Sequence, residues 1–472
     1  DYVEARDGAD TVLAGAGNDT IVATSASDGI DRYDGSSDVD TLDYSALGSS
    51  NAITVDLSVA ATHDFDGAGG NDSWQVSVNG GDNDIIKDIE NIIGGAGNDT
   101  IIANAAANEI QGGAGADLLS GNVGNDTIYG FNKGQSESSI EYDTVSYDYL
   151  TSKNVNINLT TGSAVVDAND TDTLISIENA IGGAGNDSIT GSSDINSLQG
   201  GAGNDTFVSS AANDFIYGGN VSGGTHTDSH TVGDTVDYSN SLNASNKLVA
   251  DLSTTANDGN VYSNAVVTTT VGASVYTDRL YGIENISGTS NDDTLTGNSN
   301  ANTLIGNAGN DTLQGLAGAD KLDGGAGDDL FIVGDNDVTN SGDVIIGGSD
   351  FDTVNYNGIT SQGVTIDLES GSTVTVTING QTHTLNGIEH LVGTNQADVL
   401  TGDQNLNRVE GMGGNDQIFG QDGSDFLYGG ANEANSSSSG NDTIDGKAGD
   451  DFIRGGDGAD ELKGGTGKDT IY

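Results

Sequence analysis

A nine-residue period runs through the chain and constrains its fold more than any other feature. The sixth residue of each period is acidic or an amide, and the eighth is aliphatic or aromatic, as in Asp99 with Ile101 and Asp117 with Leu119. A short fixed period of this kind is typical of a solenoid, in which each repeat buries its apolar residue only by stacking on its neighbours. The runs begin at these position-six residues: Asp10, Asp99, Asp187, Asp293, Asp398 and Asp442.

The turn half of the period is rich in glycine and oxygen ligands. The best-formed copies place glycine at positions one, two and four, as in Gly94-Gly95-Ala96-Gly97-Asn98-Asp99. Glycine permits positive φ and close backbone approach, so carbonyl oxygens can converge on an ion while the position-six carboxylate adds charge. Hard oxygen ligands without nearby His or Cys favour Ca²⁺ over zinc or copper.

These copies match the nonapeptide G-G-x-G-x-D-x-U-x, so the chain resembles the RTX (repeats-in-toxin, hemolysin-type) calcium-binding family. The resemblance implies an all-β fold of tandem right-handed parallel β-rolls, a calcium-binding β-solenoid, which here alternates with irregular β-rich spacer segments. Six residues form each turn, three form a short strand, and two nonapeptides complete one coil. Turns 18 residues apart would then stack with Ca²⁺ between them.

We therefore predict a set of Ca²⁺ ions, on the order of ten or more, held by position-six carboxylates and glycine carbonyls. The predicted aspartate ligands are Asp19, Asp99, Asp117, Asp126, Asp187, Asp205, Asp214, Asp293, Asp311, Asp320, Asp329, Asp398, Asp416, Asp425, Asp442, Asp451, Asp460 and Asp469. The predicted glycine ligands are Gly95, Gly97, Gly113, Gly115, Gly183, Gly185, Gly201, Gly203, Gly309, Gly325, Gly327, Gly449, Gly456, Gly458, Gly465 and Gly467. Ions should be shared by the pairs Asp99 with Asp117, Asp187 with Asp205, Asp293 with Asp311, Asp311 with Asp329, Asp398 with Asp416, Asp442 with Asp460 and Asp451 with Asp469.

Four spacers share a second pattern. Each contains Asp-Thr, an aliphatic residue and, two positions later, a tyrosine; a strand with period-two alternation follows, and Ile-Glu-Asn or Ile-Glu-His closes the spacer. The closing glutamates lie nine residues before the first aspartate of each roll, so the roll begins inside the spacer. We interpret this coil as a start-cap held by hydrogen bonds, with a weakened Ca²⁺ site as the alternative. The glutamates are Glu90, Glu178, Glu284 and Glu389.

The spacers divide the chain into modules. Residues 1–39 should be the end of a roll, and four units of spacer plus β-roll should cover 40–130, 131–219, 220–332 and 333–430. A Ser-rich break at 431–439 precedes a last roll at 440–472. The chain is expected to be a segment or processed form of a longer protein.

The composition makes a cation part of the fold. With 72 acidic and 13 basic residues the formal net charge is -59, and hydrophobic residues make up 34%. So acidic and apolar-poor a chain should repel itself and stay disordered unless a cation is bound. Ca²⁺ binding should therefore drive folding, leaving the rolls disordered in calcium-poor cytosol and folded outside the cell. The chain has neither cysteine for disulfides nor an apolar run long enough for a transmembrane helix, and its surface should repel nucleic acid.

Motifs for catalysis are missing from the sequence, so the chain is not expected to be an enzyme. It contains neither H-E-x-x-H nor G-x-S-x-G. His226 and His230 lie four apart in a Gly/Thr-rich stretch that favours a solvated loop over a metal site. Two acidic groups favour solvated loops, with further Ca²⁺ sites as the alternative, and the lone tryptophan should lie in a spacer core. The groups are Asp64 with Asp66, and Asp167 with Asp170 and Asp172; the tryptophan is Trp74.

Tandem modules without a distinct domain favour a scaffold. We expect a secreted, calcium-rigidified structural or adhesive protein, such as a surface layer, matrix, filament or adhesin rod, that self-associates or binds cell-surface polysaccharide or protein. The resemblance implies type I secretion from a Gram-negative bacterium. The alternative is the calcium-binding part of a larger secreted enzyme or pore-forming toxin. The sequence leaves the ligand, the lattice partner and the source open.

Overall fold

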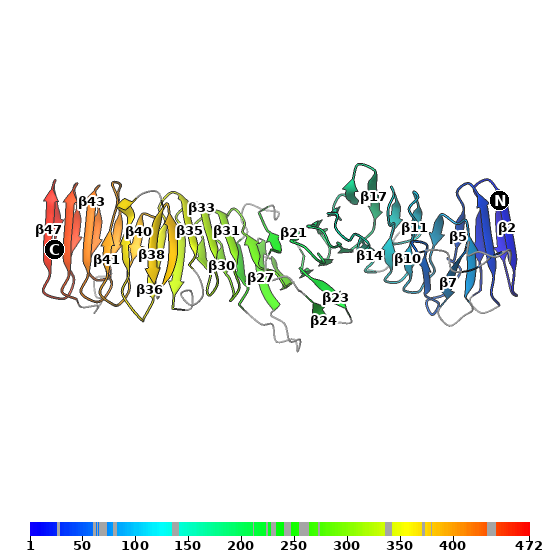
Figure 1. Cartoon of the computed structure of the whole chain (residues 1–472), viewed down its shortest axis with the longest axis horizontal. Helices are drawn as coiled ribbons and strands as arrows, with labels where there is room; N and C mark the ends of the chain where they lie inside the picture. Colours follow the sequence, from blue (N-terminus) through cyan, green and yellow to red (C-terminus); the bar gives the residue numbers. More distant parts are fainter. Residues whose placement is uncertain are drawn as a thin grey trace. The chain divides into compact units, whose positions relative to one another are not determined.

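The computed structural model is almost entirely β-structure, and its strands are the rungs of stacked coils (Figure 1). It describes residues 1–25, 29–59, 63, 65, 73–78, 83–134, 141–210, 212–222, 225–227, 233–239, 247–253, 264–271, 274–335, 342–370, 373–378, 380–431 and 440–472. The chain forms two compact units, Asp1–His230 and Thr231–Tyr472. Within the part described, no helix is long and apolar enough to cross a membrane.

Two ladders of strands form the first unit, each extended by antiparallel strands from a spacer. The first ladder, in pairing order, is β1 (Tyr2–Ala5), β3 (Thr20–Ala23), β5 (Thr41–Asp43), β9 (Asn91–Ile93), β11 (Glu109–Gln111), β13 (Thr127–Tyr129), β17 (Asp170–Ile175), β16 (Ser163–Asp167), β15 (Asn156–Asn158), β19 (Ser188–Thr190) and β21 (Thr206–Val208). The second is β2 (Thr11–Ala16), β4 (Arg32–Ser37), β8 (Asp84–Lys87), β7 (Trp74–Val78), β6 (Ile53–Asp56), β10 (Thr100–Ile102), β12 (Leu118–Ser120), β14 (Thr144–Ser146), β18 (Asn179–Ile181), β20 (Ser197–Gln199) and β22 (Phe215–Tyr217). A hairpin of β23 (Asn220–Ser222) and β24 (Thr225–Thr227) follows.

The second unit repeats this plan. One side carries β25 (Thr235–Asp237), β29 (Asn285–Ser287), β31 (Thr303–Ala308), β33 (Lys321–Ala326), β35 (Val344–Ser349), β39 (Gln381–Asn386) and β38 (Val374–Ile378), followed by a separate ladder of β37 (Thr365–Asp367), β41 (Val399–Thr401), β43 (Gln417–Asp422), β45 (Thr443–Ala448) and β47 (Glu461–Thr466). The other side carries β28 (Ser274–Tyr281), β27 (Asn264–Val271), β26 (Lys247–Asp251), β30 (Thr294–Thr296), β32 (Thr312–Gln314), β34 (Leu330–Gly334), β36 (Thr353–Gly358), β40 (His390–Val392), β42 (Arg408–Glu410), β44 (Phe426–Tyr428), β46 (Phe452–Arg454) and β48 (Thr470–Ile471). A single 3₁₀ turn, η1 (Leu368–Ser370), lies between β37 and β38.

The register confirms the expected coil. Thr100 of β10 pairs in parallel with Leu118 of β12, so residues 18 apart are neighbours and two nonapeptides make one coil. In a three-residue strand the central side chain points inward and the flanking ones outward. The central residues Ile101, Leu119 and Phe207 are accordingly fully buried. The predicted class of parallel β-roll is thus confirmed.

The spacers continue the ladders between the rolls. The strand β6 pairs with β10, placing Val55 beside Ile101, and each of the other three predicted alternating strands pairs in the same way with the first strand of its roll. The spacer tyrosines Tyr44, Tyr147, Tyr238 and Tyr356 are fully buried. Spacer and roll therefore share one hydrophobic core.

Two expectations about the spacers and breaks need correction. Trp74 is partly exposed, and its indole nitrogen donates a hydrogen bond to Val59 O; the core of its strand is formed by Val76 and Val78. The expected last roll at 440–472 continues the ladder of the preceding roll, because β43 pairs in parallel with β45 across the Ser-rich break. The break is an insertion into one coil.

Candidate metal centre

The position-six aspartates form columns of hydrogen bonds along the coils. Within a roll, Oδ1 accepts the backbone N–H of the position-six residue one coil earlier: Asp99 N donates to Asp117 Oδ1 at 2.7 Å, and Asp311 N to Asp329 Oδ1 at 2.8 Å. Oδ1 of the first aspartate of each roll accepts a spacer amide instead. Each of the seven predicted pairs is adjacent in this way. All the predicted aspartates are buried except Asp460 and Asp469, which are partly exposed.

The first turn of each roll is closed by its own backbone. Gly95 N donates to the second carboxylate oxygen, Oδ2, of Asp99 at 2.7 Å, and Gly183 N donates to Asp187 Oδ2 at 2.6 Å. Asp293 and Asp398 receive equivalent bonds from threonine amides. Asp214 is closed differently, because the Ser210 hydroxyl donates to its Oδ2 at 3.0 Å. In these turns both oxygens of the carboxylate already accept a hydrogen bond.

The following turns are open. Their position-two residue is left-handed, with φ of 114° at Gly113 and 73° at Met412, and Oδ2 of the position-six aspartate has no hydrogen-bond partner. A buried carboxylate oxygen without a donor is costly unless a cation binds it. The predicted aspartates with such an oxygen are Asp19, Asp117, Asp126, Asp311, Asp329, Asp416, Asp425 and Asp451.

Asp40 and Asp352 have the same unpaired Oδ2 and were missed by the sequence interpretation. Both belong to the Asp-Thr spacer pattern, where they were read as spacer residues. Each nevertheless lies at position six of a nonapeptide that begins with glycine, Gly35 and Gly347 respectively. That register was the signal that could have identified them.

The predicted glycines line the space between stacked turns. A β-carbon at Gly113 would overlap the carbonyl oxygen of Gly95, and one at Gly115 would overlap that of Gly97. The carbonyls of one turn thus point into the gap below the next. The same relation places Gly183 against Gly201, Gly185 against Gly203, Gly309 against Gly327, Gly325 against Gly348 and Gly449 against Gly467. Gly456, Gly458 and Gly465 share the positive φ of these turns.

The electrostatics of the open turns call for a cation. Burial raises the pKa of Asp117 to about 7, with Asp99 and Glu141 adding negative charge. Burial, together with the charges of Asp398 and Asp442, raises the pKa of Asp416 to about 8. The described residues contain no cluster of three or more His, Cys, Asp or Glu side chains that could hold a metal. A metal in these turns would therefore need backbone carbonyls besides a pair of carboxylates, a donor set that suits Ca²⁺.

The closing glutamates form the hydrogen bonds that the start-cap hypothesis requires. Glu90 Oε2 accepts Asp40 N at 2.8 Å, and Asn108 Nδ2 donates to Glu90 O at 2.6 Å. Equivalent side-chain amides donate to the carbonyls of the other three closing glutamates. Each asparagine thus ties the first coil of the roll to the spacer without a metal.

The two histidines and the two acidic groups singled out in the sequence differ in whether the structure describes them and in how buried they are. Asp64, Asp66 and His230 lie outside the described residues, and of His226 only its backbone position in β24 is described. Asp167 is exposed and its carboxylate pairs with Lys153 at 2.7 Å, as a solvated loop would predict. Asp170 and Asp172 are buried, so for these two the expected solvated loop is wrong.

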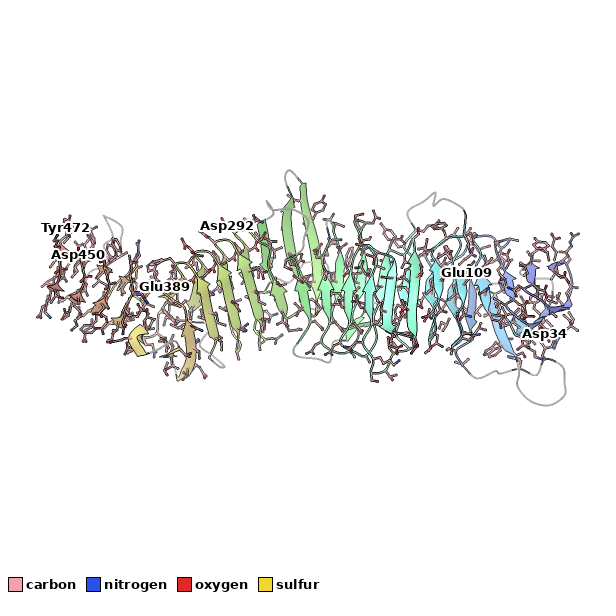
Figure 2. All side chains as sticks on the ribbon, turned by 90° about the horizontal axis from the view of Figure 1, so that it is seen from above. Asp34, Glu109, Asp292, Glu389, Asp450 and Tyr472 are labelled. Atoms are coloured by element: carbon pink, nitrogen blue, oxygen red, sulfur yellow. The ribbon has the colours of Figure 1, made fainter. Side chains whose placement is uncertain are left out.

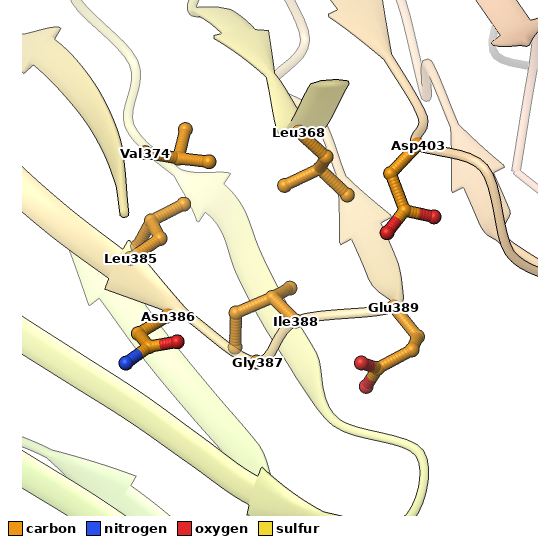
Figure 3. Close-up of a pocket in the computed structure, with 8 residues that line it drawn as sticks. All are labelled: Leu368, Val374, Leu385, Asn386, Gly387, Ile388, Glu389 and Asp403. Carbon is orange, nitrogen blue, oxygen red and sulfur yellow. The ribbon is translucent and has the colours of Figure 1, made fainter. Parts of the chain in front are cut away.

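A pocket of about 240 Å³ lies beside one start-cap (Figure 3). Its apolar wall includes Leu368, Leu385 and Ile388, and the carboxylates of Glu389 and Asp403 lie at its other side. Burial, assisted by the charge of Asp403, raises the pKa of Glu389. Glu389 Oε2 accepts Asp352 N at 3.0 Å, so this carboxylate serves the start-cap.

Acidic side chains precede three of the predicted turn aspartates, at Asp292, Asp328 and Asp450. Figure 2 labels Asp292 and Asp450, which lie next to Asp293 and Asp451. Asp292 is exposed, and its Oδ1 accepts Asn310 N at 2.8 Å. These position-five side chains link neighbouring turns on the outside, while the position-six carboxylates lie inside.

Comparison with known protein families gives one match. The RTX calcium-binding nonapeptide repeat matches residues 1–30, 102–130, 177–194, 190–221, 280–313, 296–331, 305–339, 402–432 and 436–471. The matched segments contain most of the open turns. No curated protein matches the chain.

Proposed function

The chain belongs to the family of RTX calcium-binding nonapeptide-repeat proteins, and on that premise we propose that it is a secreted structural or adhesive protein whose coils are rigidified by Ca²⁺. The observation that carries the proposal is the row of buried, unpaired Oδ2 atoms in successive open turns, among them Asp311 and Asp329. Each would accept a Ca²⁺ ion together with the carbonyl oxygens of the neighbouring turn. The ion would supply the positive charge that the fold otherwise lacks.

The scaffold role is supported by the uniformity of the architecture. The described parts of both units consist of stacked coils and the hairpins that join them, with the same ladder of aspartates in each. A stack of this kind would gain stiffness from every ion between its coils, because its stability is a sum over repeats and their interfaces. We propose that the chain is not itself an enzyme and that it acts outside the cell, where Ca²⁺ is abundant.

Calcium titration of the purified protein tests the proposal. We expect far-ultraviolet circular dichroism to show disorder in EGTA and β-structure at millimolar Ca²⁺, with Mg²⁺ at the same concentration unable to substitute because it demands a rigid octahedral site. Persistence of the full β-signal in EGTA would refute calcium-driven folding.

Assembly and adhesion are tested separately on the calcium-loaded protein. Light scattering after size exclusion and negative-stain microscopy should show ordered assemblies or binding to cell surfaces. A folded chain that stays monomeric and binds no surface would favour instead the calcium-binding part of a larger secreted enzyme or toxin.

A further inference from the structure

One glycine-rich turn stacks on a spacer hairpin where another such turn would be expected. The turn 121–126 lies against β17, because Asp126 N donates to Asp172 Oδ1 at 2.8 Å and Thr171 N donates to Asn125 Oδ1 at 2.9 Å. This register places Asp170 opposite Gly124, at the level of position four. A carboxylate therefore stands where a second glycine-rich turn would carry a glycine.

The Asp170 side chain is buried without a hydrogen-bond partner. It is 3% exposed, and neither of its carboxylate oxygens has a hydrogen-bond partner of good geometry. Burial raises the pKa of Asp170, and the nearby Gly124 amide offsets only part of that rise. Asp126 Oδ2 is also buried and unpaired. Asp172 differs, because its Oδ1 accepts the Asp126 amide and its Oδ2 the Tyr147 hydroxyl. Two buried carboxylates with unpaired oxygens thus lie in successive coils, close enough for the charge of Asp170 to act on Asp126.

The surroundings increase the negative potential at this point. Burial, together with the charges of Asp172 and Asp170, raises the pKa of Asp126 to about 8. Tyr149 closes one side by donating its hydroxyl to Asn122 O at 2.5 Å. The charge of Lys153 opposes the rise in the Asp170 pKa only weakly, and its ammonium group is paired with the exposed Asp167.

The fold itself does not require an acid at position 170. Asp172 lies six residues before the closing glutamate of its spacer, and the same offset in the third and fourth spacers gives Asp278 and His383. Two residues earlier, where Asp170 stands, those spacers carry Tyr276 and Gln381 in equivalent hairpin strands. The buried acid of the second spacer therefore needs another explanation than hairpin formation.

We propose that Asp126 and Asp170 together hold a Ca²⁺ ion that joins the end of one roll to the hairpin of the next spacer. The inference rests on the proposed calcium-dependent function but adds a site in which a side-chain carboxylate replaces the second turn's glycine. Carboxylate and carbonyl oxygens without His or Cys select Ca²⁺ over transition metals. The ion would fix the spacer to the roll that precedes it.

Anomalous diffraction from calcium-loaded crystals locates the ions directly. The wild type should show a peak between Asp126 and Asp170 as well as peaks in the open turns. Asp170→Asn should lose the first peak alone, and elemental analysis should find one Ca²⁺ fewer per chain. Asp38→Asn is the matched control, since Asp38 also occupies position four of a stacked turn but is exposed and already accepts Gly17 N at 3.1 Å.

The anomalous peaks and the ion count test the site at Asp170 separately from the sites in the open turns. Peaks in the open turns with none at Asp170 in the wild type would overturn this inference alone, whereas no peaks anywhere would overturn the proposed function. An unchanged ion count in Asp170→Asn would also contradict the site. If that variant fails to fold, the wild-type map still shows whether the site is occupied. Asp170→Gln then replaces it in the ion count, because the fourth spacer carries Gln381 at the equivalent place.

Discussion

The backbone conformation at position two, rather than the amino acid there, decides whether the carboxylate of position six is paired. Gly95 and Gly113 are the same amino acid at the same repeat position, yet Gly95 N donates to Asp99 Oδ2 while Gly113 adopts a φ of 114°. With Gly113 in this conformation its amide does not donate to the carboxylate, and Asp117 Oδ2 has no partner. Met412 adopts the same left-handed conformation although its Cβ disfavours it, at a cost of roughly 1–2 kcal/mol. Stacking therefore overrides local preference.

Replacement of one open-turn aspartate should reduce the stabilisation that the folded chain gains from Ca²⁺. Asp311→Asn keeps the acceptor for Asp293 N but removes the charge from the unpaired Oδ2. With Ca²⁺ at a hundred times its dissociation constant, loss of one site should remove about 2.7 kcal/mol of stabilisation. In EGTA, where the wild type is expected to be disordered, the variant should have as much β-structure as the wild type or more, because a buried charge is gone. Thermal unfolding at millimolar Ca²⁺ and circular dichroism in EGTA measure the two effects.

Asp292→Asn is the control for this substitution. It removes the same charge from the adjacent, exposed residue while keeping an acceptor for Asn310 N. The control should change calcium stabilisation little, since exposed charges are well screened. Equal losses in the two variants would mean that general charge, rather than the open turn, binds the ion.

The sequence predicted the ladder at residue resolution but not the state of each turn. Position six and the 18-residue pairing could be read directly from the repeat, because burial fixes the position-eight residue and hence the register. The difference between closed and open turns was not visible, because it depends on what lies beneath. Gly95 stacks on spacer atoms of Tyr44 and Leu47, whereas Gly113 stacks on another glycine-rich turn.

At the scale of elements, the spacers satisfy their buried aspartates with tyrosine. Tyr44, Tyr147 and Tyr238 donate their hydroxyls to Oδ2 of Asp84, Asp172 and Asp278 at 2.9, 2.6 and 2.9 Å. The oxygen that is unpaired in the open turns is thus paired by a side chain, so these coils need no ion. The sequence showed the tyrosine pattern, but the hairpin that brings each aspartate to it spans too many residues to be paired by inspection.

Removing one such hydroxyl should weaken its spacer whether or not Ca²⁺ is present. Tyr147→Phe leaves Asp172 Oδ2 buried without a donor, which should cost about 1–3 kcal/mol. The fourth spacer offers the control, because His383 replaces the aspartate and the Tyr356 hydroxyl has no partner. Tyr356→Phe should therefore cost little. Hydrogen exchange of the β14 and β36 amides measures both, and equal loss of protection would refute the pairing argument.

At the scale of the whole molecule, the buried carboxylates should make calcium-free stability fall as pH rises. Free aspartates titrate near pH 4, whereas burial raises the pKa of Asp311 and Asp425 to about 7 and that of Asp143 to about 8. Between these limits the folded chain binds more protons than the unfolded one, so stability is present at low pH and is lost as pH passes through the folded pKa values.

We therefore expect calcium-stripped protein to retain β-structure near pH 5 and to lose it between pH 6 and 8. Millimolar Ca²⁺ should reverse the trend, since protons then compete with the ion for the same oxygens. Relief of the overall charge of -59 is a separate effect, which 0.5 M NaCl would reproduce by screening at constant pH. Circular dichroism and sedimentation velocity across this range distinguish the two. If salt alone restores the fold at pH 8, or if calcium-free stability rises with pH, the unpaired carboxylates are not what makes the fold depend on calcium.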